Sequence, residues 1–455
     1  MTVRALLGLV VLHAGFLGAG TAVLFALGGL GYRREAVRLA GLSYLLGISV
    51  LGIAWTCLLA AGVPFGLVTV VVTIGLAAAA GVVVGRGRGL ALADGAPIVA
   101  RRALLVGAAG VALVGLYLEV LFRSARLEGL YSFDGWAFWV PRGKAIYYAG
   151  GFDPDVFAAV PHASYPPVVP ILDAAAFHAM GSADVVTLHV QYWLFALGFL
   201  AAVAGLLVRR VPAWILWPSV ALVLVLPRMR ASLLAAQADY LLDYLVVTAA
   251  ILLLLWLSER RPWQLHAAAL LLACGAIVKR EGLVLAGCVL AGAAVASWRS
   301  RRWAWPRLAA VAAVAAVATV PWQLWYRAHG IRGELGSGGS HELFSRRTLD
   351  SLRLAVDVLA GSGRWSVVPT IGLVAVVLAA VWGRRSHAAF AGVAVGLLTL
   401  AGASTSVVFP DIGVTADEAV NPIVRLTGGT VLLVACLTPL LLAGVWAGRS
   451  ARYES

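Results

Sequence analysis

The chain has 455 residues, of which 62% are hydrophobic and only 12% are charged, and its mean hydropathy is +0.93. Soluble domains carry about 25% charged residues, so this composition excludes an ordinary soluble protein. The formal net charge of +14 does not indicate a nucleic-acid partner, because most of the excess lies in short arginine turns between apolar runs. Such turns set membrane topology and contact anionic membrane lipids.

Apolar runs long enough to cross the hydrocarbon core recur along the whole chain, without the alternating pattern of barrel strands. They predict an all-α polytopic membrane protein with about 13 transmembrane helices. The expected spans lie near residues 5–30, 41–61, 66–84, 103–122, 185–208, 211–227, 240–258, 264–279, 282–298, 305–324, 365–383, 388–409 and 426–447. The first run is too long for a signal-peptide core, so we expect it to remain as a span. The cysteines lie inside apolar runs without metal-ligand spacing, which predicts buried thiols rather than disulfides or a zinc site.

The arginine turns all fall on one side of the membrane if these spans alternate, and that side should be cytoplasmic. The long segments 123–184, 325–364 and 410–425 then lie on the other side, with most of the acidic residues. We therefore expect a multi-pass protein of the plasma (inner) membrane whose chemistry takes place on the extracytoplasmic face. These outer segments should be amphipathic and are too short to form a large soluble domain.

The first candidate site residue is Asp134, which lies in an aromatic run (residues 130–144) where an apolar span ends. Tryptophans such as Trp136 and Trp139 favour the boundary between bilayer and water, so Asp134 should lie at the depth of a lipid head group. Lys144 follows it by ten residues and is the nearest lysine. The alternative is that Asp134 is a solvated loop acid or a helix cap.

Two further groups lie on the same expected face. Tyr165 opens a Tyr-Pro-Pro sequence whose prolines fix a kinked path; Tyr165 would contact substrate, although a plain surface turn is the alternative for the prolines. Asp239 and Asp243 are four residues apart and share one helix face. Two such acids repel each other unless a cation, a metal or a sugar hydroxyl lies between them. Capping by Asp239 is the alternative.

The last two groups are cationic. Lys279, Arg280 and Glu281 form a charged hinge before Gly282, between two spans so close in sequence that the hairpin must be tight. This cluster suits a phosphate, and an interfacial ion pair is the alternative. Arg425 begins the last span and is either a snorkelling anchor or another phosphate contact. Together the groups describe a site for a lipid-phosphate substrate with its head group at the interface.

These positions resemble the C-type (GT-C) glycosyltransferases that use polyprenyl-phosphate sugars, in particular a bacterial branch related to protein mannosyltransferases and aminoarabinose transferases. The matching sequences are Phe133-Asp134-Gly135-Trp136, the stretch 139–144, Tyr165-Pro166-Pro167, Ala238-Asp239 and Lys279-Arg280-Glu281-Gly282. The resemblance implies three added N-terminal helices (1–102), a catalytic core (103–325) with outer loop 123–184, and an outer loop with C-terminal helices (326–455). Two features depart from it: the acid follows a fourth span rather than the first, and Arg280 replaces a neutral polar residue.

The resemblance implies inverting transfer of a sugar from a polyprenyl-phosphate donor to a hydroxyl acceptor on a lipid, glycan or protein. Asp134 would be the general base and the basic residues would hold the leaving phosphate. The donor and substrate site would comprise Lys144, Tyr165, Asp239, Asp243, Lys279, Arg280, Glu281 and Arg425. No cofactor is firmly indicated, and a divalent metal at the acids has no supporting ligand spacing. The rival hypothesis is a transporter or flippase of lipid-linked glycans or solutes, which predicts interrupted helices at mid-membrane.

Overall fold

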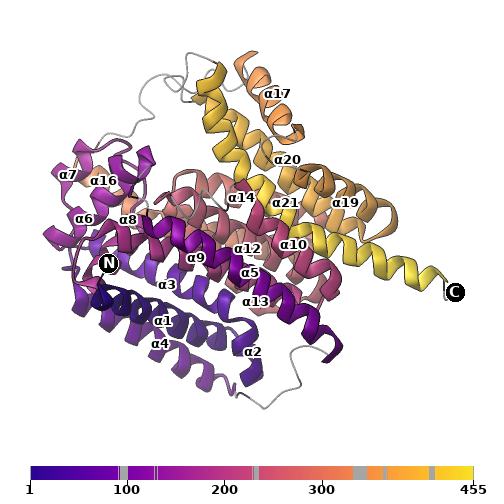
Figure 1. Cartoon of the computed structure of the whole chain (residues 1–455), viewed down its shortest axis with the longest axis horizontal. Helices are drawn as coiled ribbons and strands as arrows, with labels where there is room; N and C mark the ends of the chain where they lie inside the picture. The colour runs from indigo at the N-terminus through magenta and orange to yellow at the C-terminus, as the bar shows by residue number, and fades with distance from the viewer. Residues whose placement is uncertain are drawn as a thin grey trace. The chain divides into compact units, whose positions relative to one another are not determined.

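The computed structural model describes residues 2–90, 92, 101–127, 129–130, 132–227, 229, 235–331, 346–361, 365, 367–408 and 416–453. These residues form helices and no strand, as the composition predicts (Figure 1). Among the described residues, eight helices are long and apolar enough to cross a membrane: α1 (Val3–Ala26), α3 (Ala40–Ala60), α4 (Leu67–Gly87), α9 (Val185–Leu207), α12 (Ala238–Glu259), Trp298–Ala328, and the stretches Arg385–Ser404 of α20 (Arg385–Val408) and Thr427–Ala447 of α21 (Ala416–Tyr453).

The other five expected spans also form helices: four have 13 to 17 residues, and α5 (Arg101–Leu127) has 27. The four shorter helices are α10 (Ala213–Val225), α13 (Pro262–Val278), α14 (Glu281–Ala296) and α19 (Val368–Trp382). Thirteen membrane spans are therefore not confirmed in the part of the chain that the structure describes. The stretch Trp298–Ala328 is built from η2 (Trp298–Ser300), α15 (Arg301–Ala318) and α16 (Val320–Ala328). The remaining elements are α2 (Arg33–Arg38), η1 (Gly135–Trp139), α6 (Val140–Ala149), α7 (Pro154–Ala159), α8 (Val168–Met180) and the amphipathic α17 (Arg346–Ala360).

The chain forms two compact units. The first comprises Met1–Arg209, Arg230–Leu283 and Val311–Glu334, and the second comprises Arg210–Met229, Val284–Ala310 and Leu335–Ser455. The N-terminal helices and all candidate site residues except Arg425 belong to the first unit. The cysteines are all free; Cys274, Cys288 and Cys436 are buried as predicted, whereas Cys57 is exposed.

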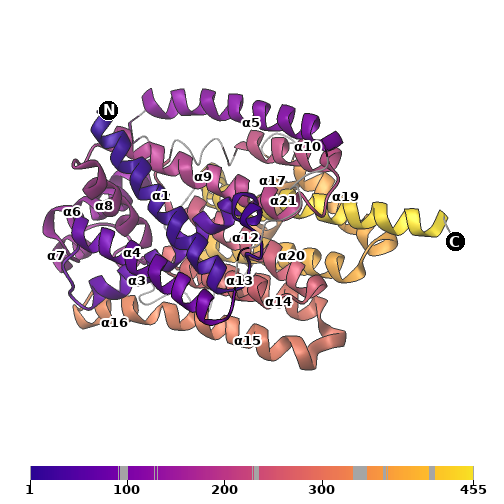
Figure 2. The same cartoon turned by 90° about the horizontal axis from the view of Figure 1, so that it is seen from below.

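Helices α1, α3 and α4 lie side by side in the first unit (Figures 1 and 2). The contact between α1 and α3 depends on glycines that allow the two backbones to touch. A Cβ atom at Gly20 would lie 1.6 Å from the carbonyl oxygen of Ser43, and one at Gly47 would lie 1.8 Å from that of Phe16. Small residues of this kind are what permit close helix packing in lipid, where helix association gains no hydrophobic driving force.

Helix α8 follows the Tyr-Pro-Pro sequence, and residues 164–177 are entirely buried. Its first residue, Val168, lies deep in the unit, because a Cβ atom at Gly52 of α3 would be 3.2 Å from Val168 Cγ1. Gly52 is eight residues before the end of α3, which corresponds to about 12 Å along the helix. The alternative of a plain surface turn at the prolines is therefore wrong, because the prolines are buried among the helices.

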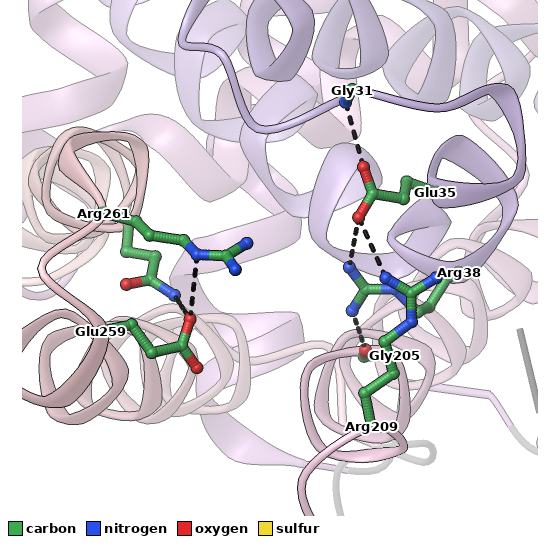
Figure 3. Close-up of polar contacts among 8 residues, drawn as sticks. Gly31, Glu35, Arg38, Gly205, Arg209, Glu259 and Arg261 are labelled. Carbon is green, nitrogen blue, oxygen red and sulfur yellow. Dashed lines mark hydrogen bonds and ion pairs between the residues drawn. The ribbon is translucent and has the colours of Figure 1, made fainter. Parts of the chain in front are cut away.

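The opposite ends of the helices carry an ion network (Figure 3). The Glu35 carboxylate accepts a hydrogen bond from the Gly31 N–H at 3.0 Å and forms ion pairs with Arg38 at 3.4 Å and Arg209 at 3.2 Å. Burial disfavours the charged form of Glu35, but the Gly31 hydrogen bond and the two arginine charges outweigh it and hold the pKa of Glu35 below its ordinary value. Arg38 also donates to the Gly205 carbonyl at 2.7 Å, which ties α2 to the C-terminal end of α9.

Further arginine loops of the first unit lie at this same end. Arg88 donates to the carbonyl oxygen of Ala26 at the end of α1. A Cβ atom at Gly29 would lie 3.2 Å from the Trp263 ring, beside the turn in which Arg261 pairs with Glu259 at 3.5 Å (Figure 3). These loops therefore share one end of the helices, as the alternation of the spans predicts, and Asp239 lies at the other end of α12.

Candidate functional site

Asp134 directly precedes the π-helix η1, which continues into α6. Its backbone is helical (φ −59°, ψ −36°), and its side chain makes no capping hydrogen bond. The capping role belongs to Ser132, whose hydroxyl oxygen accepts a hydrogen bond from the Gly135 N–H at 3.2 Å. The interpretation of Asp134 as a helix cap is therefore wrong. Single π-helical turns occur frequently at functional sites, and this one carries a half-buried carboxylate at its start.

The segment that carries Asp134 packs against the residues that lead into α12. A Cβ atom at Gly135 would lie 3.3 Å from the Ala236 carbonyl oxygen and 3.6 Å from the Ala236 Cβ atom. Ala236 stands three residues before Asp239 in the sequence. The fold thus brings Asp134 to the end of the helix that carries Asp239 and Asp243.

Asp239 and Lys279 form the centre of a buried ion-pair cluster. Lys279 Nζ lies 2.9 Å from Asp239 Oδ1 and 3.1 Å from Glu281 Oε1, and the three side chains are 7%, 5% and 13% exposed. Asp239 is not the N-cap of α12, because Gln237 holds that position. Removing one partner of such a buried pair costs about 3 to 5 kcal/mol, since the remaining charge is left uncompensated. Asp243 is buried one turn further along α12.

The turn after α13 is as tight as its sequence predicts. A Cβ atom at Gly282 would lie 1.9 Å from the Gly275 carbonyl oxygen, and the Gly282 N–H donates to the Lys279 carbonyl oxygen at 3.0 Å. Glycine is therefore required for this close approach, and the approach fixes Lys279 opposite Asp239.

Tyr165 links the two halves of the site. Its buried ring lies 5.6 Å from Lys279 Nζ and 5.9 Å from Arg280 Cζ. The same ring stacks on Trp139, the last residue of η1, with 5.8 Å between centroids. Cations within about 6 Å of an aromatic ring are attracted to its face. Tyr165 therefore connects the helix that follows Asp134 to the charged hinge.

Lys144 and Arg425 are the two remaining expected site residues. Lys144 lies half-buried on α6 and makes none of the ion pairs of the Lys279 cluster. Arg425 belongs to α21 in the second unit, and its side chain lies outside the described residues. No group of three or more His, Cys, Asp or Glu side chains that could hold a metal ion occurs among the residues that the structure describes.

Arg142 is a buried charge that the sequence analysis missed. Its side chain is fully buried, donates to the Pro161 carbonyl oxygen at 3.0 Å, and lies 5.3 Å from the ring of Phe157. It therefore holds the segment before Tyr165 against α6. Its position between aromatic residues was a usable signal, because arginine stacks on aromatic rings more often than lysine does.

Asp173 on α8 is the second missed residue. It is completely buried, and its carboxyl group accepts hydrogen bonds from Gln191 Nε2 at 2.8 Å and from the Tyr192 hydroxyl at 3.1 Å. A Cβ atom at Gly143 would lie 2.8 Å from the Asp173 Cβ atom, so α6 rests directly on this residue. A lone acid in an apolar stretch was the available signal, and the polar partners are far from it in sequence.

No family model, curated protein or solved structure matches the chain.

Proposed function

We propose that the protein is an integral membrane glycosyltransferase that moves a sugar from a polyprenyl-phosphate donor to a hydroxyl acceptor, with inversion at the anomeric carbon. The observation that carries the proposal is the convergence of Asp134, the Tyr165 ring and the Lys279–Arg280 hinge on one end of the first unit. A carboxylate, a guanidinium and aromatic faces are what a phosphate-linked sugar needs for recognition.

In this mechanism the acceptor oxygen attacks the anomeric carbon while the Asp134 carboxylate takes its proton. The bond between the anomeric carbon and the phosphate oxygen breaks, and the electron pair leaves with the phosphate. A phosphate leaving group scarcely needs protonation, so a second carboxyl group acting as general acid, as in glycoside hydrolases, is not required. A cationic group at the hinge would stabilise the charge on the departing phosphate.

The surroundings of Asp134 support a lipid-borne substrate. Phe133, Trp136 and Tyr148 are exposed aromatic side chains on this segment. Aromatic residues prefer the interface between bilayer and water, where the phosphate of a polyprenyl lipid also lies. The arginine loops at the opposite end of the helices favour placing the site on the extracytoplasmic face of the plasma membrane.

A transporter of lipid-linked glycans is the second candidate, favoured by the buried polar groups within the helices. His13 and Tyr44 pair at 2.6 Å inside α1 and α3, in addition to the Asp173 network. Ionisable groups buried within membrane spans often mark transport pathways. This hypothesis gives the tight charged hinge, which lies at the same end of the unit as Asp134, no role in chemistry.

The two functions predict different products. Purified protein in liposomes, given radiolabelled polyprenyl-phosphate pentose or hexose and a membrane extract as acceptor, should release one polyprenyl phosphate for each sugar that becomes attached to acceptor. A transporter would instead move the intact glycolipid across the bilayer. Liposomes without protein are the control. Translocation of intact donor without any release of polyprenyl phosphate would contradict the transferase.

A further inference from the structure

Two adjacent cations, Lys279 and Arg280, face the same ring of Tyr165, but their electrostatic environments differ. The Lys279 ammonium group is in contact with two carboxylates, at 2.9 and 3.1 Å, and its side chain is only 7% exposed. Two carboxylates more than neutralise one ammonium charge. A phosphate that approached Lys279 would have to displace an acid and would be repelled by the other.

Arg280 is placed differently. It is half-buried rather than buried, and its Nη1 atom has no hydrogen-bond partner among the described residues, although that atom is shielded from solvent. A shielded guanidinium nitrogen without an acceptor costs free energy unless a ligand supplies one. Arginine is well suited to this role, because its planar fork of donors matches the oxygens of a phosphate.

We infer that Arg280 is the residue that binds the phosphate of the polyprenyl donor, whereas Lys279 is a positioning residue that holds Asp239 and Glu281 in place. This division of roles rests on the proposed function. It replaces the expectation that both cations hold the phosphate. It also gives a physical reason for the departure at position 280, where the resemblance leads one to expect a neutral polar residue.

The inference is tested by binding of polyprenyl phosphate without a sugar to the full chain in lipid nanodiscs. Arg280→Gln should keep the melting temperature of the parent and bind polyprenyl phosphate about 10-fold to 100-fold more weakly, as expected for loss of a charged hydrogen bond. The matched control is Arg261→Gln, which removes an arginine from the opposite end of the unit and should leave binding unchanged.

Lys279 needs a variant that does not leave Asp239, the more buried of its two acidic partners, charged and unpaired. The double variant Lys279→Gln with Asp239→Asn removes both members of the 2.9 Å ion pair and leaves hydrogen-bonding groups in their place. It should bind polyprenyl phosphate within about threefold of the parent, because the anion contact is at Arg280. Parent-like binding by Arg280→Gln, together with lost binding by the folded double variant, would overturn the assignment.

Two further arms identify the ligand. Polyprenol, which lacks the phosphate, should not compete, and inorganic phosphate should compete only at far higher concentrations than polyprenyl phosphate. Competition by inorganic phosphate at equal concentration would overturn a lipid ligand. The proposed function can fail independently of this assignment. If the parent protein binds polyprenyl phosphate through Arg280 but transfers no sugar, the phosphate site is supported and the transferase activity is refuted.

Discussion

Replacing Asp134 with Asn should lower the rate of sugar transfer by roughly 100-fold to 10,000-fold while leaving donor binding largely intact. Asn keeps the size of the side chain but cannot accept a proton at neutral pH. The structure makes this substitution informative, because the Asp134 side chain is not used to cap a helix. Turnover would be followed as release of polyprenyl phosphate by purified protein whose melting profile shows that it is folded.

The chain offers a matched control in Asp153, an acid of the same region that does cap a helix. Its Oδ1 atom accepts hydrogen bonds from the N–H groups of Asp155 and Val156 at the start of α7. Asn and Asp cap about equally well, so Asp153→Asn should leave transfer unchanged. Parent-like transfer by the folded Asp134→Asn variant would remove Asp134 from the mechanism and make Asp239 the next acid to test.

The second large effect concerns the fold rather than the chemistry. Gly20→Ala should prevent α1 and α3 from packing in the observed position, because the new Cβ atom would lie 1.6 Å from the backbone oxygen of Ser43. Backbone atoms cannot move aside as a flexible side chain can, so the helices must separate. We expect a loss of at least about 3 kcal/mol of stability, at the upper end of overpacking costs. The measurement is the fraction of folded, monodisperse protein after heating in detergent.

Gly18 is the matched control for Gly20, since it lies on the same helix and nothing stands within 4 Å of its Cβ position. Gly18→Ala should leave stability unchanged or slightly raise it, because alanine favours a helix over glycine by about 1 kcal/mol. If both variants retain parent-like stability, the contact between α1 and α3 is not as close as described.

The helical architecture could be predicted from composition, because a bilayer leaves the backbone few options besides helices. The pairing of Asp239 with Lys279 could also be predicted from the sequence. Asp239 lies at the start of α12 and Lys279 directly follows the end of α13, so both are at nearly equal distances in sequence from the turn at Arg260. These nearly equal distances bring them to the same level. The number of spans was less predictable, because a run of apolar residues does not reveal where its helix begins or ends.

Other features depend on contacts that a single sequence does not encode locally. Thirteen residues of α8 are too few to read as a span, so their burial was not expected. The partners of Asp173 lie on α9, and only the packing of α8 against α9 brings them to it. The backbone conformation at Asp134 could not be predicted either, since an acid before glycine and aromatic residues is compatible both with a helix cap and with the start of a π-helix.

Whether Arg280 and Asp134 bind the same donor is tested by a structure with a non-reacting donor bound, such as a polyprenyl phosphonate joined to the sugar through carbon. We expect the phosphonate oxygens to lie within about 3 Å of the Arg280 guanidinium. The sugar should lie against Tyr165, with its anomeric carbon between the phosphonate and the Asp134 carboxylate. A donor whose head group binds away from both Arg280 and Asp134 would contradict the central claim that these residues serve one ligand.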